Sequence, residues 1–139
     1  MNPAATPKPD TNETHQQHLF RREQLSTEVG PETKTDYSVT LKGDMDANSA
    51  HVCFHYVPDK YVLNPISLEH YLMALDQTDW QNLETLALAI LDDINNEAVP
   101  RWVQILIQST NNKSGSGHRV LVQDRQPNWD NAPLLGRLR

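Results

Sequence analysis

Residues 51–75 of the chain, HVCFHYVPDKYVLNPISLEHYLMAL, change from the periodicity of a strand to that of a helix. Residues 51–57 alternate apolar and polar side chains, which is typical of a half-buried β-strand. Successive side chains of a strand point to opposite sides of the sheet. The apolar face of this strand would carry Val52, Phe54 and Tyr56. The opposite face would carry His51, Cys53 and His55.

Two helices are predicted after this strand. Pro58-Asp59 breaks the strand, and Asn64-Pro65 supplies a helix cap followed by proline at the first helical position. The apolar stripe of this first helix consists of Leu68, Tyr71, Leu72 and Leu75. Thr78-x-x-Gln81 has the spacing of a capping box and predicts the start of a second helix. The stripe of the second helix consists of Trp80, Leu83, Ala87, Ile90, Leu91 and Ile94.

Further strand patterns lie on both sides of this central part. Residues 37–42 precede the strand at 51–57 across a turn at 43–48, and the runs at 101–108 and 119–123 follow the helices. The order of elements is therefore ββααββ. Two hairpins joined by a pair of helices predict an α+β fold, in which two helices cover one face of an antiparallel four-stranded sheet.

The length of 139 residues leaves room for one domain. Residues 1–34 are rich in proline, polar and charged residues, so we expect this segment to be largely disordered. One short helical turn that docks on the core could still be formed there by Leu19, Phe20 and Leu25. Residues 35–124 would form the domain, and residues 125–139 a tail. The tail is either an arm that docks on a neighbour or a frayed terminus, and its large apolar side chains are Trp129, Leu134, Leu135 and Leu138.

The composition excludes several classes of function. A net charge of −6 argues against binding to nucleic acid or to anionic membrane surfaces. No apolar run approaches the roughly 18 residues of a membrane span, and no secretion signal is present, so a cytoplasmic location is expected. The single cysteine, Cys53, rules out an internal disulfide and a multi-thiolate zinc site.

Four short motifs, in order, resemble the central part of a known enzyme family. They are Tyr56-Val-Pro-Asp59, Ser67-Leu-x-x-Tyr-Leu72, Ile90-Leu-Asp-Asp-Ile94 and Pro100-Arg-Trp102. The family is the NADPH-dependent 7-cyano-7-deazaguanine nitrile reductases of queuosine biosynthesis, and the resemblance covers about residues 50–108. It implies a tunnelling fold, whose ββααββ subunits pair into homo-oligomeric barrels with ligand sites between subunits.

The groups that the resemblance would assign to catalysis are missing. The family's nucleophilic cysteine precedes the strand that ends in YVPD, and residues 37–50 contain no cysteine. Asn48 lies about where the family's general acid would align. In the family's cofactor motif, Glu-Ser-Lys-Ser-Leu-Lys, a glutamate and a lysine are replaced here by Asn64 and Ile66. We therefore expect no catalytic residue of that family, no bound cofactor and no metal site.

One binding residue of the family has a counterpart. The family's His-Glu pair aligns with Leu83-Glu84, so Glu84 is the candidate substrate-binding residue. A carboxylate can accept two parallel hydrogen bonds from the N–H edge of a guanine-like ring. The structural explanation for the same residue is a solvated glutamate on the flank of a helix.

Three further candidates have simpler explanations. Cys53 has no basic partner that the sequence indicates, so a small strand residue is the favoured interpretation. The polar strand face at His51, Cys53 and His55 could chelate a metal, but neighbours on one face lie about 6.6 Å apart and do not easily reach one ion. Asp92-Asp93 does not form an acid–base pair, because adjacent residues of a helix point in different directions.

Three hypotheses about function remain. The first is a non-catalytic binding or assembly protein of the tunnelling fold. The second is an enzyme that binds a purine- or pterin-like molecule but performs different chemistry. The third is an active nitrile reductase with unusual residues. The expected partners are further copies of the chain and such a heterocycle.

Overall fold

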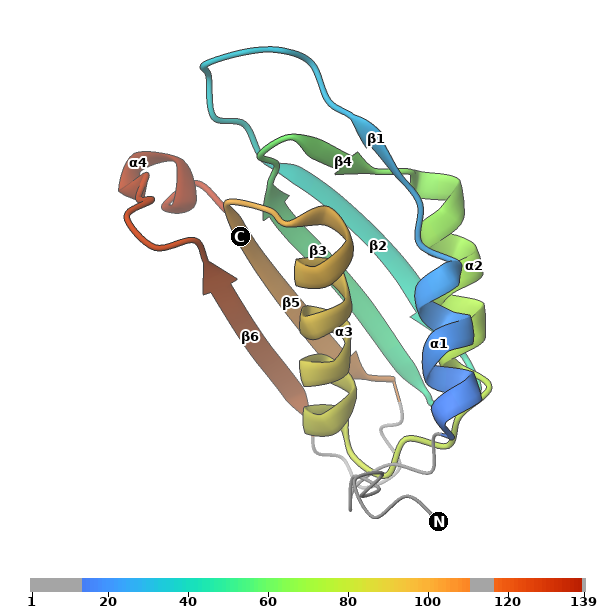
Figure 1. The fold of residues 1–139 in the computed structure, drawn as a ribbon. Coiled ribbons are helices and arrows are strands. Elements are labelled where there is room, and N and C mark those ends of the chain that lie inside the picture. Colours follow the sequence, from blue (N-terminus) through green and yellow to red (C-terminus); the bar gives the residue numbers. More distant parts are fainter. Residues whose placement is uncertain (1–13, 111–116, 139) are drawn as a thin grey trace.

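The computed structural model describes residues 14–110 and 117–138 of the chain (Figure 1). Its centre is a four-stranded antiparallel sheet in the order β2-β3-β5-β6. The strands are β2 (Val39–Met45), β3 (Ala50–Val57), β5 (Trp102–Ser109) and β6 (Arg119–Arg125). Helices α2 (Pro65–Leu75) and α3 (Leu83–Ala98) follow β3 in the chain and cover one face of the sheet. The predicted α+β fold with a ββααββ core is confirmed.

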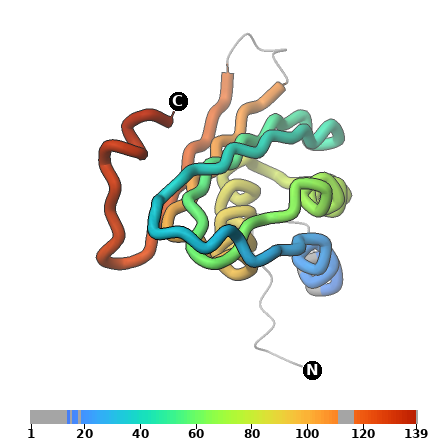
Figure 2. Tube along the Cα trace, turned by 90° about the horizontal axis from the view of Figure 1, so that it is seen from above, coloured from blue at the N-terminus to red at the C-terminus, as the bar shows by residue number. Residues whose placement is uncertain are grey.

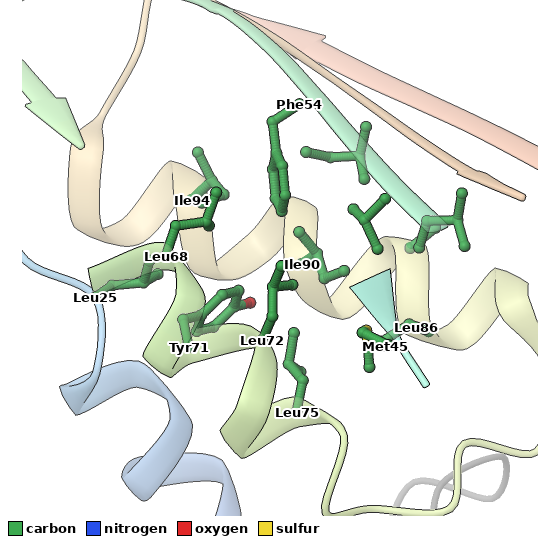
Figure 3. Packing of buried hydrophobic residues seen from close by; sticks show 14 of the residues in the cluster. Leu25, Met45, Phe54, Leu68, Tyr71, Leu72, Leu75, Leu86, Ile90 and Ile94 are labelled. Atoms are coloured by element: carbon green, nitrogen blue, oxygen red, sulfur yellow. The ribbon is translucent and has the colours of Figure 1, made fainter. Parts of the chain in front are cut away.

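The apolar face of β3 lies at the centre of the core. Phe54 pairs with Leu41 of β2 and with Ile105 of β5, and all three side chains point toward the helices. Figure 3 shows Phe54 above side chains from α2 and α3, among them Tyr71, Leu72 and Ile90. The alternation predicted for residues 51–57 is therefore the pattern that buries one face of β3 under the helices.

Helix α2 packs very closely on strand β2. At Gly43, an added Cβ atom would lie 2.3 Å from Cδ1 of Leu72, which is inside van der Waals contact. A side chain at this position would displace the Leu72 methyl group, so glycine suits the close approach of the strand and the helix. The turn predicted at 43–48 accordingly begins later, because β2 extends to Met45 before the chain reverses.

A small second sheet was not predicted. Strands β1 (Thr27–Val29) and β4 (Tyr61–Leu63) pair antiparallel beside the start of α2. Each has only three residues, which is too short for an alternating pattern to indicate a strand. This sheet joins the N-terminal segment to the connection between β3 and α2.

The N-terminal segment differs from the expectation of disorder within the part that the structure describes. Helix α1 (His15–Glu23) begins with a capping box formed by Thr14 and Gln17, and it packs beside α2 (Figure 1). Arg21 provides the physical reason, because its guanidinium is buried against Asp93 of α3. Of the three apolar residues proposed to dock, Leu25 is buried, while Leu19 and Phe20 are exposed. Residues 1–13 of the predicted disordered segment lie outside the described residues.

The C-terminal tail lies against the four-stranded sheet, on the face opposite the helices (Figure 2). It contains one short helix, α4 (Ala132–Leu135). Trp129 and Asn131 donate hydrogen bonds to Asp36, at 3.2 Å and 3.1 Å, and Asp36 also binds Arg101. The Asp36 carboxylate is thus the acceptor that holds the tail in place. Residues 129–138 cover part of the sheet face that lies opposite the helices.

Among the described residues, no helix is long and apolar enough to cross a membrane.

Candidate functional site

The candidate site lies at the N-terminus of α3. Asn82 caps the helix, and its side-chain oxygen accepts a hydrogen bond from the amide of Thr85 at 2.8 Å. The predicted capping box at Thr78 is wrong: the helix begins at Leu83, and the Thr78 side chain is buried without a hydrogen-bond partner in the structure. Asn82, four residues further along the chain, supplies the cap instead.

Glu84 occupies the first turn of α3 with its carboxylate in solvent. The side chain is 60% exposed, and Oε2 lies 3.4 Å from Nε2 of His118, at the start of β6. The helix dipole favours a negative charge at this position. The site residue predicted from the sequence therefore has an open carboxylate with an imidazole beside it. His118 was missed, because 34 positions separate it from Glu84 and only the fold brings them together.

A shallow cavity of about 230 Å³ lies next to this pair. His118 forms one side, and the loop before α3 with Trp80, Asn82 and Leu83 forms the other. Glu84 does not line the cavity itself, but it contacts His118, which does. The arrangement places an imidazole and apolar side chains in the cavity and a carboxylate next to it.

Asn48, which the resemblance places about where the family has a general acid, has a structural role. Its amide nitrogen donates to Oδ1 of Asp76 at 2.8 Å and to the carbonyl of Thr78 at 2.9 Å. Its oxygen accepts from the backbone amide of Trp80 at 3.0 Å. The side chain therefore ties the β2–β3 turn to the α2–α3 connection, and both of its polar atoms are engaged.

The segment aligned with the cofactor motif begins helix α2. Asn64 caps the helix by accepting hydrogen bonds from the amides of Ile66 and Ser67. The side chain of Ser67 is buried and binds the backbone of Ser26. Ile66 is 67% exposed, so an apolar side chain faces solvent where the family places a lysine. Residues 64–68 themselves include no lysine or arginine.

The polar face of β3 contains a contact that the sequence did not indicate. Sγ of Cys53 lies 3.4 Å from Nε2 of His55, and Nδ1 of His55 lies 2.9 Å from the hydroxyl of Thr40. Burial raises the pKa of the Cys53 thiol and lowers the pKa of His55. The thiol therefore has an imidazole beside it, which corrects the prediction of no basic partner. The sequence signal for this contact is the i, i+2 spacing of Cys53 and His55, which places both side chains on the same face of a strand.

The side chains of His51, Cys53 and His55 on this face do not surround a common position for a metal ion. His51 points to Asp44 of β2, with Nδ1 2.7 Å from the carboxylate, and away from the contact between Cys53 and His55. Within the described ranges, no group of three or more histidine, cysteine or acidic side chains has the geometry to hold a metal ion.

Asp92 and Asp93 hold helix α1. Asp93 is fully buried and accepts hydrogen bonds from Arg21, Arg22 and the hydroxyl of Tyr71. Asp92 is exposed and binds Arg22 at 2.7 Å. Burial, followed by the charge of Asp93, raises the pKa of Tyr71 well above its ordinary value. The two carboxylates thus bind arginines of one neighbouring helix, which is a structural role.

No family model matches the chain. It is similar to the NADPH-dependent 7-cyano-7-deazaguanine reductases of two strains of Acidithiobacillus ferrooxidans, with 29% identity to each over 89 residues. The matched region covers 64% of this chain, and it spans 62% of each reductase, which is less than two thirds of their length. The similarity supports a distant relationship to these reductases.

Proposed function

We propose that this chain binds a guanine-like heterocycle at Glu84 and does not reduce a nitrile. In this proposal it is a non-catalytic binding or assembly protein, related to the reductases by fold and by one recognition residue. The observation that carries it is the open carboxylate of Glu84 beside His118 and a cavity, at the position where the resemblance implies a substrate contact.

The recognition chemistry follows from the two side chains. The carboxylate of Glu84 accepts two parallel N–H donors, a pattern that guanine, deazaguanine and pterin rings present at one edge. His118 can donate to or accept from a neighbouring ring atom, depending on its tautomer. The apolar walls beside Leu83 and Trp80 suit the faces of a flat heterocycle.

The loss of reduction is supported by three positions. Residues 37–50 offer no thiol to attack a nitrile, and Asn48 has both polar atoms engaged in the fold. Ile66 replaces the lysine that would supply a charge to a cofactor phosphate. The resemblance implies a nucleophilic thiol, a general acid and a lysine at these positions. Here each position carries a different side chain.

Thermal unfolding with guanine, a deazaguanine and a pterin tests the binding proposal. A ligand that binds only the folded chain raises the Tm by mass action. Glu84→Gln should abolish the increase, because it removes the charge and one acceptor while it keeps the size of the side chain. Glu97→Gln, at the other end of α3, is the matched control and should keep the increase. No increase at millimolar ligand, or an equal increase in wild type and Glu84→Gln, contradicts the proposal.

A nicotinamide assay tests the loss of reduction separately. We expect no oxidation of NADPH when 7-cyano-7-deazaguanine is added to the protein. A substrate-dependent decrease of nicotinamide absorbance that scales with the amount of protein would instead support an active reductase. An enzyme of purine or pterin metabolism with different chemistry remains the alternative, and it would show ligand binding at Glu84 without NADPH oxidation.

A further inference from the structure

A second cavity lies on the open face of the sheet, away from Glu84. It has a volume of about 410 Å³, and its floor consists of side chains from β2, β3 and β5. Arg137 and Leu138 of the tail form one wall, and Figure 2 shows the tail on this side of the sheet. The cavity contains Cys53 and His55, which the proposed heterocycle site does not use.

Three side chains in this cavity form a connected chain. The hydroxyl of Thr40 lies 2.9 Å from Nδ1 of His55, and Nε2 of the same ring lies 3.4 Å from the Cys53 sulfur. If Nδ1 carries the proton and donates it to Thr40, Nε2 is the acceptor that faces the thiol. A nucleophile, a base and a group that orients the base are thereby placed in order.

The charges around the thiol are positive. Lys42 and Arg137 line the cavity. Burial raises the pKa of the Cys53 thiol overall, and the positive charge of Lys42 offsets part of that increase. For His55, burial and then the charge of Lys42 both lower the pKa. His51 also lines the cavity, but its ring is paired with Asp44, whose carboxylate is mostly exposed. Because burial lowers the pKa of His55, its imidazole stays neutral and able to accept a proton at neutral pH.

We propose that Cys53 is a nucleophile, with His55 as its general base, and that it captures small electrophiles that carry a carboxylate. The natural class is an α,β-unsaturated ester or ketone that also carries a carboxylate. The Cys53 sulfur forms a bond to the carbon β to the ester or ketone carbonyl while its proton moves to Nε2 of His55. The electron pair of the double bond moves toward the α-carbon, which then takes the proton from His55. No group leaves, and neither oxidant nor reductant is needed.

The cations determine which electrophiles enter. A carboxylate between Lys42 and Arg137 is held within a cavity that excludes part of the water, where charge attraction is stronger than in bulk solvent. Thr40 acts as a positioning residue, since it fixes the ring of His55 and does not touch the electrophile. The tail is part of the site, because Arg137 comes from it.

Cys53 is the only cysteine of the chain, so the mass of the intact protein reports its modification at a single position. Monomethyl fumarate and dimethyl fumarate are both conjugate acceptors, and only the first carries a carboxylate at neutral pH. We expect the ratio of their addition rates, monomethyl over dimethyl, to exceed the ratio for an uncharged thiol, N-acetylcysteamine, by about tenfold. An equal ratio, or addition that occurs only after unfolding in urea, would overturn the proposal.

Two variants separate the roles of charge and base. Lys42→Gln should slow the addition of monomethyl fumarate severalfold and leave that of dimethyl fumarate nearly unchanged. Lys60→Gln, in the exposed turn after β3, is the matched control and should change neither rate. Selectivity that persists in Lys42→Gln would contradict the assignment of the carboxylate to this cavity.

His55→Gln tests the general base through the dependence of the rate on pH. In wild type, the rate should rise as His55 loses its proton and then level off before the thiol ionises. In the variant, the rate should rise only as the thiol ionises. Identical profiles would show that His55 does not act as the base. Circular dichroism establishes that the variant folds, and the selectivity ratio of wild type requires no variant.

Discussion

Asn48 has a structural role at a position where the resemblance implies a catalytic acid. Its amide nitrogen donates to the Asp76 carboxylate and to the carbonyl of Thr78, and its oxygen accepts from Trp80. A carboxylate at this position could make only the last of these contacts, and it would face another carboxylate. The amide is therefore required by the turn, whatever its position in the alignment implies about catalysis.

We predict that Asn48→Asp destabilises the protein instead of restoring a catalytic acid. The substitution removes the side-chain donor from Asp76, which keeps its bonds from the backbone amides of Ala47 and Asn48, and from the Thr78 carbonyl. It also sets two negative charges in contact, at a cost of about 1–3 kcal/mol. Urea unfolding measures this difference. Gln77→Glu, at an exposed neighbouring position, is the control for added negative charge, and it should cost less. Unchanged stability in Asn48→Asp would show that the hydrogen-bond network contributes little.

Among the candidate residues, the sequence proposed Glu84 through the resemblance, but it did not predict the surroundings of this side chain. His118 lies near it only because β6 starts beside the first turn of α3. The contact of Cys53 with His55 follows from strand geometry, yet the role of Thr40 depends on the register in which Thr40 pairs with His55. A pattern within one strand is visible in the sequence, and a register between strands is not.

At the level of elements, periodicity predicted the long strands and helices, and it failed at the short ones. The buried stripes of α2 and α3 repeat often enough to be recognised. Strands β1 and β4 have three residues each, and they pair across a long separation in the sequence. For α1 itself, Thr14 and Gln17 had capping-box spacing, but its anchor is one buried arginine, which composition alone does not reveal.

We predict that Arg21→Ala releases helix α1 and destabilises the protein strongly. Arg21 makes a two-pronged contact with the buried Asp93 and lies 5.9 Å from the centre of the Trp80 ring. Removal of one partner of a buried ion pair costs roughly 3–5 kcal/mol when the remaining charge is left uncompensated. Arg22 and Tyr71 still contact Asp93 in this variant, so we expect a cost near the lower end of that range. Arg125→Ala breaks an exposed pair with Asp130 and should cost about 0–1 kcal/mol. Chemical unfolding, with hydrogen exchange of α1, compares the two.

We predict that the tail detaches in acid, because protonation of Asp36 weakens the contacts that hold it. A hydrogen bond from Asn131, with further contacts to Arg101 and Trp129, lowers the pKa of Asp36 below its ordinary value of 3.8. A lowered pKa in the folded state means that the stabilisation is present above the unfolded pKa and is lost as the pH falls through the folded pKa. We expect the indole N–H signal of Trp129 to shift over that window in a nuclear magnetic resonance titration.

Two comparisons test the assignment of this transition. The indole of Trp80 donates to the carbonyl of Leu75 in the core, so its signal should not follow the same titration. In Asp36→Asn, the shift of the Trp129 signal in acid should disappear. A transition that persists in this variant would show that another group controls the tail.

For the whole molecule, the sheet leaves two strands with an unpaired edge. Strands β2 and β6 each have one neighbour in the four-stranded sheet. Exposed edges favour pairing with another chain, and closed barrels remove them. We therefore predict a homo-oligomer in which subunits pair edge to edge, with the open sheet face turned inward.

Leu121 of β6 provides the test of this arrangement. It pairs with Leu106, lies on the same face as Cys53, and is 58% exposed. An inward-facing position would bury it, so Leu121→Lys should shift the oligomer toward monomer at micromolar concentration, as measured by light scattering coupled to size exclusion. Leu88→Lys is a matched control, because Leu88 is 57% exposed on α3, the side away from the predicted interface. A wild-type monomer would contradict the assembly, and equal effects of both variants would place the contact elsewhere.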